Sequence, residues 1–142
     1  MGQVRPRPFA RSRFSLIMEG FESIVAKEVG GEGLDAMVAG FYKRVKEDDL
    51  IGPMYPDDDW EGSEERLRDF LRFRLLGEQA YMLKRGHPRL RARHMPFSIG
   101  EPERDRWLQL MGEAMDEAEV AGPAREGLDA FFAQVADFMR NR

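Results

Sequence analysis

Residues 87–97 read HPRLRARHMPF, and this stretch decides how the rest of the chain is interpreted. The chain has only two histidines, His87 and His94, and both lie in it. Pro88 suits the first position of a helix, where its missing N–H costs nothing. Pro96 disfavours a helix that continues past it. The sequence therefore predicts a short helix over residues 88–95.

His94 follows Leu90 by four residues, so the two share one face of that helix, while Arg89 and Arg93 share the next face. A structural histidine needs only hydrogen-bond partners. A general base needs a catalytic partner, and none is evident beside it. Zinc needs more protein ligands than two histidines supply. Haem iron needs only one, and arginines suit the haem carboxylates. From this segment alone, a structural role is favoured over haem binding.

Composition narrows the class of protein. A length of 142 residues predicts one domain that is large enough to bury a core. No apolar run approaches the roughly 20 residues that a membrane span needs. The net charge of −4 argues against nucleic acid as a partner. With no cysteine, the chain has no disulfide or thiolate chemistry, which fits a cytoplasmic protein.

The N-terminus differs from the rest of the chain. Arginines at positions 5, 7, 11 and 13 make residues 1–13 basic, because this stretch has no acidic residue. Prolines are frequent there and apolar periodicity is absent. We interpret residues 1–20 as a flexible Arg-rich extension and residues 21–142 as the folded domain. A solvated tail is favoured over one that docks on an acidic partner or a membrane surface.

Beyond residue 20 the apolar residues recur at helical spacing and nowhere alternate as in a strand. An all-α domain of four sizeable helices and several short ones is therefore expected. Ser63 to Arg66 has a capping-box pattern for the second sizeable helix. The four apolar stripes are Leu34, Met37, Val38, Phe41, Tyr42 and Val45; Leu67, Phe70, Leu71 and Leu75; Trp107, Leu110, Met111, Ala114, Met115 and Ala118; and Leu128, Phe131, Phe132, Val135, Phe138 and Met139.

A family resemblance reverses the preference for a structural histidine. The chain resembles the truncated haemoglobins, specifically their second group, from about residue 22 to its C-terminus. The family fold is a shortened globin, a two-over-two helical sandwich around haem. It implies helices near 32–47, 62–76, 88–95, 101–119 and 124–141. The matching residues are Gly30-Gly31, Phe41-Tyr42, Pro53-Met54-Tyr55-Pro56, Glu64 to Arg68, Phe70-Leu71, Tyr81, Arg85 to Arg91, Arg93-His94, Pro96-Phe97, Glu103 to Asp105 and Trp107.

The resemblance also implies roles for individual residues, with haem b and its iron as cofactor. His94 matches the proximal iron ligand. Tyr42, Tyr55 and Trp107 match the polar aromatic residues on the opposite face of the haem, where Ser63 and Leu67 match two further positions. The remaining expected haem contacts are Arg66 and Tyr81 at the propionates, Arg85, His87 and Arg93 as weaker propionate partners, and Phe70, Leu90 and Phe97.

One segment departs from the family pattern. The family has Trp-Gly-Gly-Pro after its distal helix, whereas this chain has Leu75-Leu76-Gly77-Glu78. The connection toward Tyr81 is therefore expected to be stiffer or reshaped, which puts ligand access and the Tyr81 contact in doubt.

Two functions fit these features. The first is a haem protein that reversibly binds dioxygen, or another diatomic gas such as NO or CO, in oxygen binding or transport. The second is a haem redox enzyme for nitric oxide detoxification or peroxidase-like oxidation. The enzyme would need a separate reductase, because no flavin or nicotinamide motif is evident. A haem-free helical interaction module is a third class, and a homodimer is left open.

Overall fold

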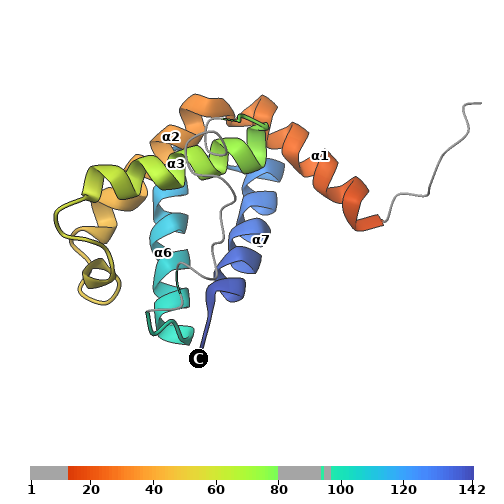
Figure 1. Cartoon of the computed structure of the whole chain (residues 1–142). Coiled ribbons are helices and arrows are strands. Elements are labelled where there is room, and N and C mark those ends of the chain that lie inside the picture. Colours follow the sequence, from red (N-terminus) through yellow and green to blue (C-terminus); the bar gives the residue numbers. More distant parts are fainter. Residues whose placement is uncertain (1–12, 80–93, 95–96) are drawn as a thin grey trace, which may run out of the picture.

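The computed structural model describes residues 13–79, 94 and 97–142 of the chain (Figure 1). Within them all regular structure is helical, as the sequence predicts. The α-helices are α1 (Arg13–Glu28), α2 (Gly30–Val45), α3 (Trp60–Leu76), α6 (Glu101–Glu117) and α7 (Gly122–Met139), with a 3-10 turn at Gly52–Met54. No helix in the described ranges is long and apolar enough to cross a membrane.

The helices form two packed pairs. α2 packs against α3 in one pair and also against α6, which pairs with α7. α1 contacts α2, α3 and α7, and its first turns project away from the other helices (Figure 1). The expected two-over-two arrangement is confirmed, and the four sizeable helices start and end within about two residues of their expected bounds.

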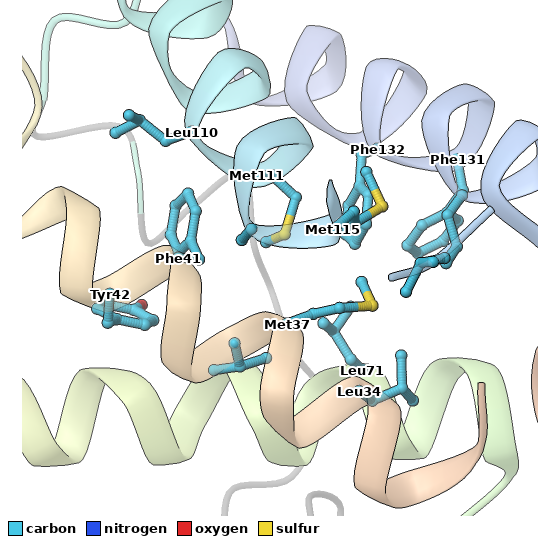
Figure 2. Packing of buried hydrophobic residues seen from close by; sticks show 14 of the residues in the cluster. Leu34, Met37, Phe41, Tyr42, Leu71, Leu110, Met111, Met115, Phe131 and Phe132 are labelled. Atoms are coloured by element: carbon cyan, nitrogen blue, oxygen red, sulfur yellow. The ribbon is translucent and has the colours of Figure 1, made fainter. Parts of the chain in front are cut away.

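The core fills the space between the pairs. Leu34, Met37 and Phe41 of α2 are fully buried and face α6. Met111 and Met115 of α6 meet them there (Figure 2). The alternating long and aromatic side chains interdigitate, which is how a helical core reaches the density of a protein interior. This core fixes the two pairs relative to each other and so positions any site between them.

One expected helix start is wrong, and one expected boundary falls inside a helix. Asp59 caps α3, accepting a hydrogen bond from the Gly62 N–H at 3.2 Å, so the helix begins one turn before the expected capping box at Ser63. Residues 13–20, expected in a flexible extension, belong to α1. Gly30 is the first residue of α2, where the chain turns from α1 into α2. Its φ is +65°, a backbone conformation that glycine tolerates best. Residues 1–12 lie outside the described part, so the extension there stays a prediction.

Helical periodicity also predicts the wrong burial for one residue of the last apolar stripe. Phe138 was expected on the inner face of the last helix, but it is 57% exposed. It lies in the final turn of α7, where Asp137 and Arg140 make ion pairs at the surface. The inner face ends at Met139, which is buried.

Candidate functional site

A cavity of about 390 Å³ lies between the two helix pairs. Its walls come from α2, the loop that follows it, α3, the segment from His94 to Ile99, α6 and α7. The volume is within the range of about 300–1,000 Å³ typical of small-molecule sites. The walls are mostly apolar, with a few polar groups converging from different elements, as expected for a cofactor pocket.

The structure brings together many of the predicted site residues at this cavity. Those that line it are Tyr42, Tyr55, Ser63, Arg66, Leu67, Phe70, His94, Phe97 and Trp107. The others, Tyr81, Arg85, His87, Leu90 and Arg93, lie outside the described residues, as does most of the expected helix over residues 88–95. Their roles stay predictions.

His94 is half-buried and helical in conformation, and it lines the cavity. Its carbonyl oxygen accepts a hydrogen bond from the Phe97 N–H at 3.0 Å, which turns the chain before Ile99. The segment that follows, including Phe97 and Ile99, contributes to the same wall.

Two tyrosines and a tryptophan form a polar aromatic group in another part of the wall. The rings of Tyr42 and Tyr55 meet edge to face, with centroids 5.6 Å apart. Burial raises the pKa of Tyr55 to about 12, while hydrogen bonds from Trp107 and Tyr42 act in the opposite direction. Burial also raises the pKa of Tyr42 far above its usual range. Both phenols therefore remain protonated at neutral pH and keep an O–H to donate.

Trp107 is held in place by apolar rings on both sides. Its centroid lies 4.9 Å from that of Phe41 on α2 and 5.5 Å from that of Phe132 on α7. Such tilted pairs restrict a side chain to one orientation. The indole is therefore fixed at the junction of three helices, with its N–H close enough to bond Tyr55.

Trp60 belongs to this aromatic group although the sequence analysis did not single it out. Its ring stacks on Tyr55 at 5.7 Å and meets Tyr42 at 6.5 Å. Trp60 is half-buried at the first residue of α3 and is not part of the cavity lining. The feature of the sequence that could have identified Trp60 as part of the site is its position directly after the turn-rich loop from Pro53 to Asp59.

The first turns of α3 carry the polar groups nearest that loop. Ser63 is 5% exposed and accepts a hydrogen bond from Arg66 at 3.1 Å. The other terminal nitrogen of Arg66 lies 3.2 Å from Asp59, the capping residue of the helix. Arg66 is thus a cation at the cavity wall that pairs with Asp59, and the remaining N–H groups of its planar guanidinium can bind a ligand-borne carboxylate.

Several lining residues were expected only in the core. The cavity lining includes four residues of α7: Phe131, Phe132, Val135 and Met139. Their helical spacing predicted that they are buried, but it did not predict that they line a cofactor pocket. Arg104 of α6 also lines it. Its guanidinium pairs with Asp105 and Asp137, each at 3.0 Å, so it is a weaker candidate than Arg66 for binding a ligand carboxylate.

The set of donor groups fits haem. In the part of the chain that the structure describes, no group of three or more His, Asp or Glu side chains is placed to hold a metal ion. A metal that has His94 as its single protein ligand would need a group that supplies the other ligands. A porphyrin does so, and it needs an apolar cavity, one imidazole and a cation for its carboxylates.

Comparisons with known proteins agree with this geometry. A family model described as bacterial-like globin matches residues 25–141. Group 2 truncated haemoglobin YjbI of Bacillus subtilis (strain 168) is 38% identical over 114 residues, covering 80% of this chain and 86% of the relative. The X-ray structure of a truncated oxygen-avid haemoglobin from Bacillus subtilis has a TM-score of 0.77 at 36% identity, over 82% of this chain and 98% of that one. The structure of a thermostable haemoglobin from Thermobifida fusca has a TM-score of 0.77 at 39% identity, over 85% and 96% of the two chains.

Proposed function

This chain belongs to the bacterial-like globins, as a group 2 truncated haemoglobin with haem as its cofactor, and on that premise we propose that it binds dioxygen reversibly. Other diatomic gases, such as NO and CO, would bind at the same site. When bound, haem would supply an iron atom that can take one protein ligand and one small gas molecule. In this proposal His94 is the protein ligand to the iron.

The observation that carries the proposal is that one cavity has an imidazole in one wall and several hydrogen-bond donors in another. A diatomic ligand that draws electron density from iron becomes a better hydrogen-bond acceptor. Tyr55 keeps its own O–H for a ligand, and Trp107 and Tyr42, which donate to Tyr55 in the structure, can redirect their N–H and O–H to a bound ligand. Tyr42 is buried and Tyr55 and Trp107 are half-buried, so these donors compete with less water than they would in solution.

Arg66 supports the proposal from the cavity edge. It can bind a haem propionate while Asp59 and Ser63 hold its guanidinium in place. Phe70, Leu67 and Phe97 supply apolar contacts for the porphyrin faces and edges. The expected contacts from Tyr81, Leu90 and the arginines at 85 and 93 remain part of the proposal.

The number of donors favours slow ligand release. One hydrogen bond contributes about 1–3 kcal/mol, which corresponds to about 10- to 100-fold in a release rate. A relative of known structure is described as oxygen-avid, which agrees with this expectation. Tight binding suits scavenging or sensing better than transport.

Stopped-flow measurement of oxygen release tests the proposal. Trp107→Phe keeps an aromatic ring between Phe41 and Phe132 but removes the N–H, so release should accelerate on the order of 10- to 100-fold. Trp60→Phe is a matched control, because it keeps a ring on Tyr55 from outside the cavity lining. Wild-type protein that binds no oxygen, or equal release rates in wild type and Trp107→Phe, would contradict the assigned role.

A haem redox enzyme is the second candidate function. The observation that favours it is that three oxidisable rings, Tyr42, Tyr55 and Trp107, lie in the cavity wall. Such an enzyme needs an external electron donor. Rapid peroxide-dependent oxidation of a dye by wild-type protein, lost in Trp107→Phe, would favour this function over simple gas binding.

A further inference from the structure

Asn141 connects the C-terminus of the chain to the segment that follows His94. It lies just beyond α7, which ends at Met139. Its side-chain nitrogen donates to the carbonyl oxygen of Phe97 at 2.7 Å, and its side-chain oxygen accepts from the Ile99 N–H at 2.9 Å. Its backbone N–H donates to the Ile99 carbonyl oxygen, also at 2.9 Å.

A longer contact extends this bonding to the histidine itself. The side-chain nitrogen of Asn141 lies 3.4 Å from the His94 carbonyl oxygen, which also accepts the bond from the Phe97 N–H. The amide of Asn141 therefore contacts the backbone at the start, middle and end of the segment 94–99. These contacts span more than 40 positions in the sequence, so they join two parts of the chain that are far apart in sequence.

The bonded segment is also a wall of the cavity. Phe97 and Ile99 of this segment line the cavity. Ala136 and Met139 of α7, the helix that ends just before Asn141, line it as well. Ile99 is 7% exposed and Asn141 is half-buried, so water competes only partly for the bonds to Ile99 and His94, whereas the bond to Phe97 is exposed. The amide thus fixes the distance between the end of α7 and the turn that carries His94.

We propose that Asn141 is a positioning residue for His94, which sets the height and tilt of its imidazole relative to the cavity. This proposal rests on the proposed function, in which His94 binds the haem iron. Asn141 does not itself touch the cofactor. It acts through the backbone groups of His94, Phe97 and Ile99 that it contacts, because a shift of the His94 backbone moves the Cα of the histidine.

The chemistry of the amide explains why asparagine suits this position. One side chain must donate to the carbonyl of Phe97 and accept from the N–H of Ile99 at the same time. An amide has both a donor and an acceptor in one plane, whereas a carboxylate has only acceptors. Aspartate would keep the bond to Ile99 and place a negative charge against the Phe97 carbonyl. Alanine would lose all three side-chain contacts, to His94, Phe97 and Ile99.

The test uses the full-length haem protein and four variants: Asn141→Ala, Asn141→Asp, Asn141→Gln and Gln134→Ala. Gln134 is an exposed amide on α7 and serves as the control. The iron–histidine stretching band of the ferrous form, measured by resonance Raman, reports the imidazole position. Transfer of haem to an excess of an apo-globin acceptor gives the rate of haem loss.

We expect the iron–histidine band to shift or broaden in Asn141→Ala and Asn141→Asp, with haem loss on the order of 10-fold faster. Asn141→Gln should restore part of the wild-type behaviour, because it keeps both amide groups one methylene further out. Gln134→Ala should match wild type. Hydrogen exchange of the Ile99 N–H in the haem-free protein should accelerate in Asn141→Ala, since its acceptor is gone.

Two results would overturn the proposal in distinguishable ways. If Asn141→Ala lowers the melting temperature but leaves the band and the rate of haem loss at their wild-type values, Asn141 only fastens the C-terminus. If wild type shows no iron–histidine band, or His94→Ala keeps it, then the assignment of His94 has failed and the inference falls with it.

Discussion

Tyr55 holds its hydroxyl proton more tightly than a tyrosine in water does. Burial raises its pKa from 10.0 to about 12, against hydrogen bonds from Trp107 and Tyr42. Between these two values the folded chain binds more protons at this site than the unfolded chain. Stability therefore falls as the pH rises through this window. The stabilisation is fully present below about pH 10 and is lost toward about pH 12.

Urea titrations at several pH values measure this effect. The free energy of unfolding of wild type should fall between about pH 10 and 12. The fall should be less steep in Tyr55→Phe, which has no hydroxyl to ionise. Equal slopes for the two proteins would contradict the burial of this phenol beside Tyr42 and Trp107.

Other residue contacts show what the sequence can predict. The segment around His94 is informative because one histidine between two prolines, flanked by arginines, leaves few cofactor chemistries open. The stacking of Trp60 on Tyr55 could not be predicted, because it depends on how the loop before α3 folds back. The bonds of Asn141 could not be predicted either, since a lone amide near a C-terminus has no pattern that marks its partner.

The loop between α2 and α3 is held by an ion pair in which the carboxylate is buried and the guanidinium is partly exposed. Asp48 accepts backbone bonds from Leu50 and Ile51 at 3.1 and 2.9 Å, and Arg106 of α6 donates to it at 2.6 Å. Burial raises the pKa of Asp48, but these hydrogen bonds outweigh burial and lower the pKa below 3.8 overall. The pair therefore stabilises the fold above about pH 3.8 and is lost as the pH falls further. It also positions the loop that carries Tyr55.

Asp48→Asn should reduce the free energy of unfolding by about 1–3 kcal/mol at neutral pH, because it weakens three hydrogen bonds and leaves Arg106 without its main partner. Asp49→Asn is the matched control, since its side chain is 99% exposed and lies 3.8 Å from Arg106. Denaturant titration compares the two. If both substitutions change stability equally, the specific role of Asp48 is wrong.

The end of α3 depends on one glycine. Gly77 has φ +74°, and a side-chain carbon added there would meet nothing within 4 Å. Gly77→Ala should therefore destabilise the fold by about 1 kcal/mol through backbone strain alone.

Gly20, in α1, is equally open but has no positive φ. Gly20→Ala should stabilise by up to about 1 kcal/mol. Thermal unfolding separates the two, and a loss of stability in Gly20→Ala would contradict this explanation.

At the element scale, strong stripes predicted α2, α3, α6 and α7, whereas α1 was not recognised. The stripe of α1 beyond residue 20 is short, with Phe21 and Val25 among charged residues, and the helix is completed by packing on α3 and α7. Phe138 shows the opposite case. Its spacing fits the apolar face of α7, but its side chain is 57% exposed in the last turn of that helix.

At the scale of the whole molecule, the helical stripes predicted an all-α fold, and the family resemblance that includes the His94 segment predicted the two-over-two arrangement. The cavity could not be located from stripes alone, because the same residues that fill a core can also line a pocket. Phe131 and Phe132 illustrate this, since both belong to the hydrophobic cluster and to the cavity wall. Whether these residues fill a core or line a space for haem depends on how the two helix pairs are arranged, and the stripes do not show that arrangement.

The central claim is that this cavity holds haem through His94. An absorption spectrum of the purified protein after haem reconstitution and gel filtration tests it most directly, with His94→Ala and the exposed-site control Gln134→Ala measured in parallel. Wild type and the control should keep a strong Soret band, and His94→Ala should lose most of it. If His94→Ala retains haem as firmly as wild type, or wild type retains none, the claim is contradicted.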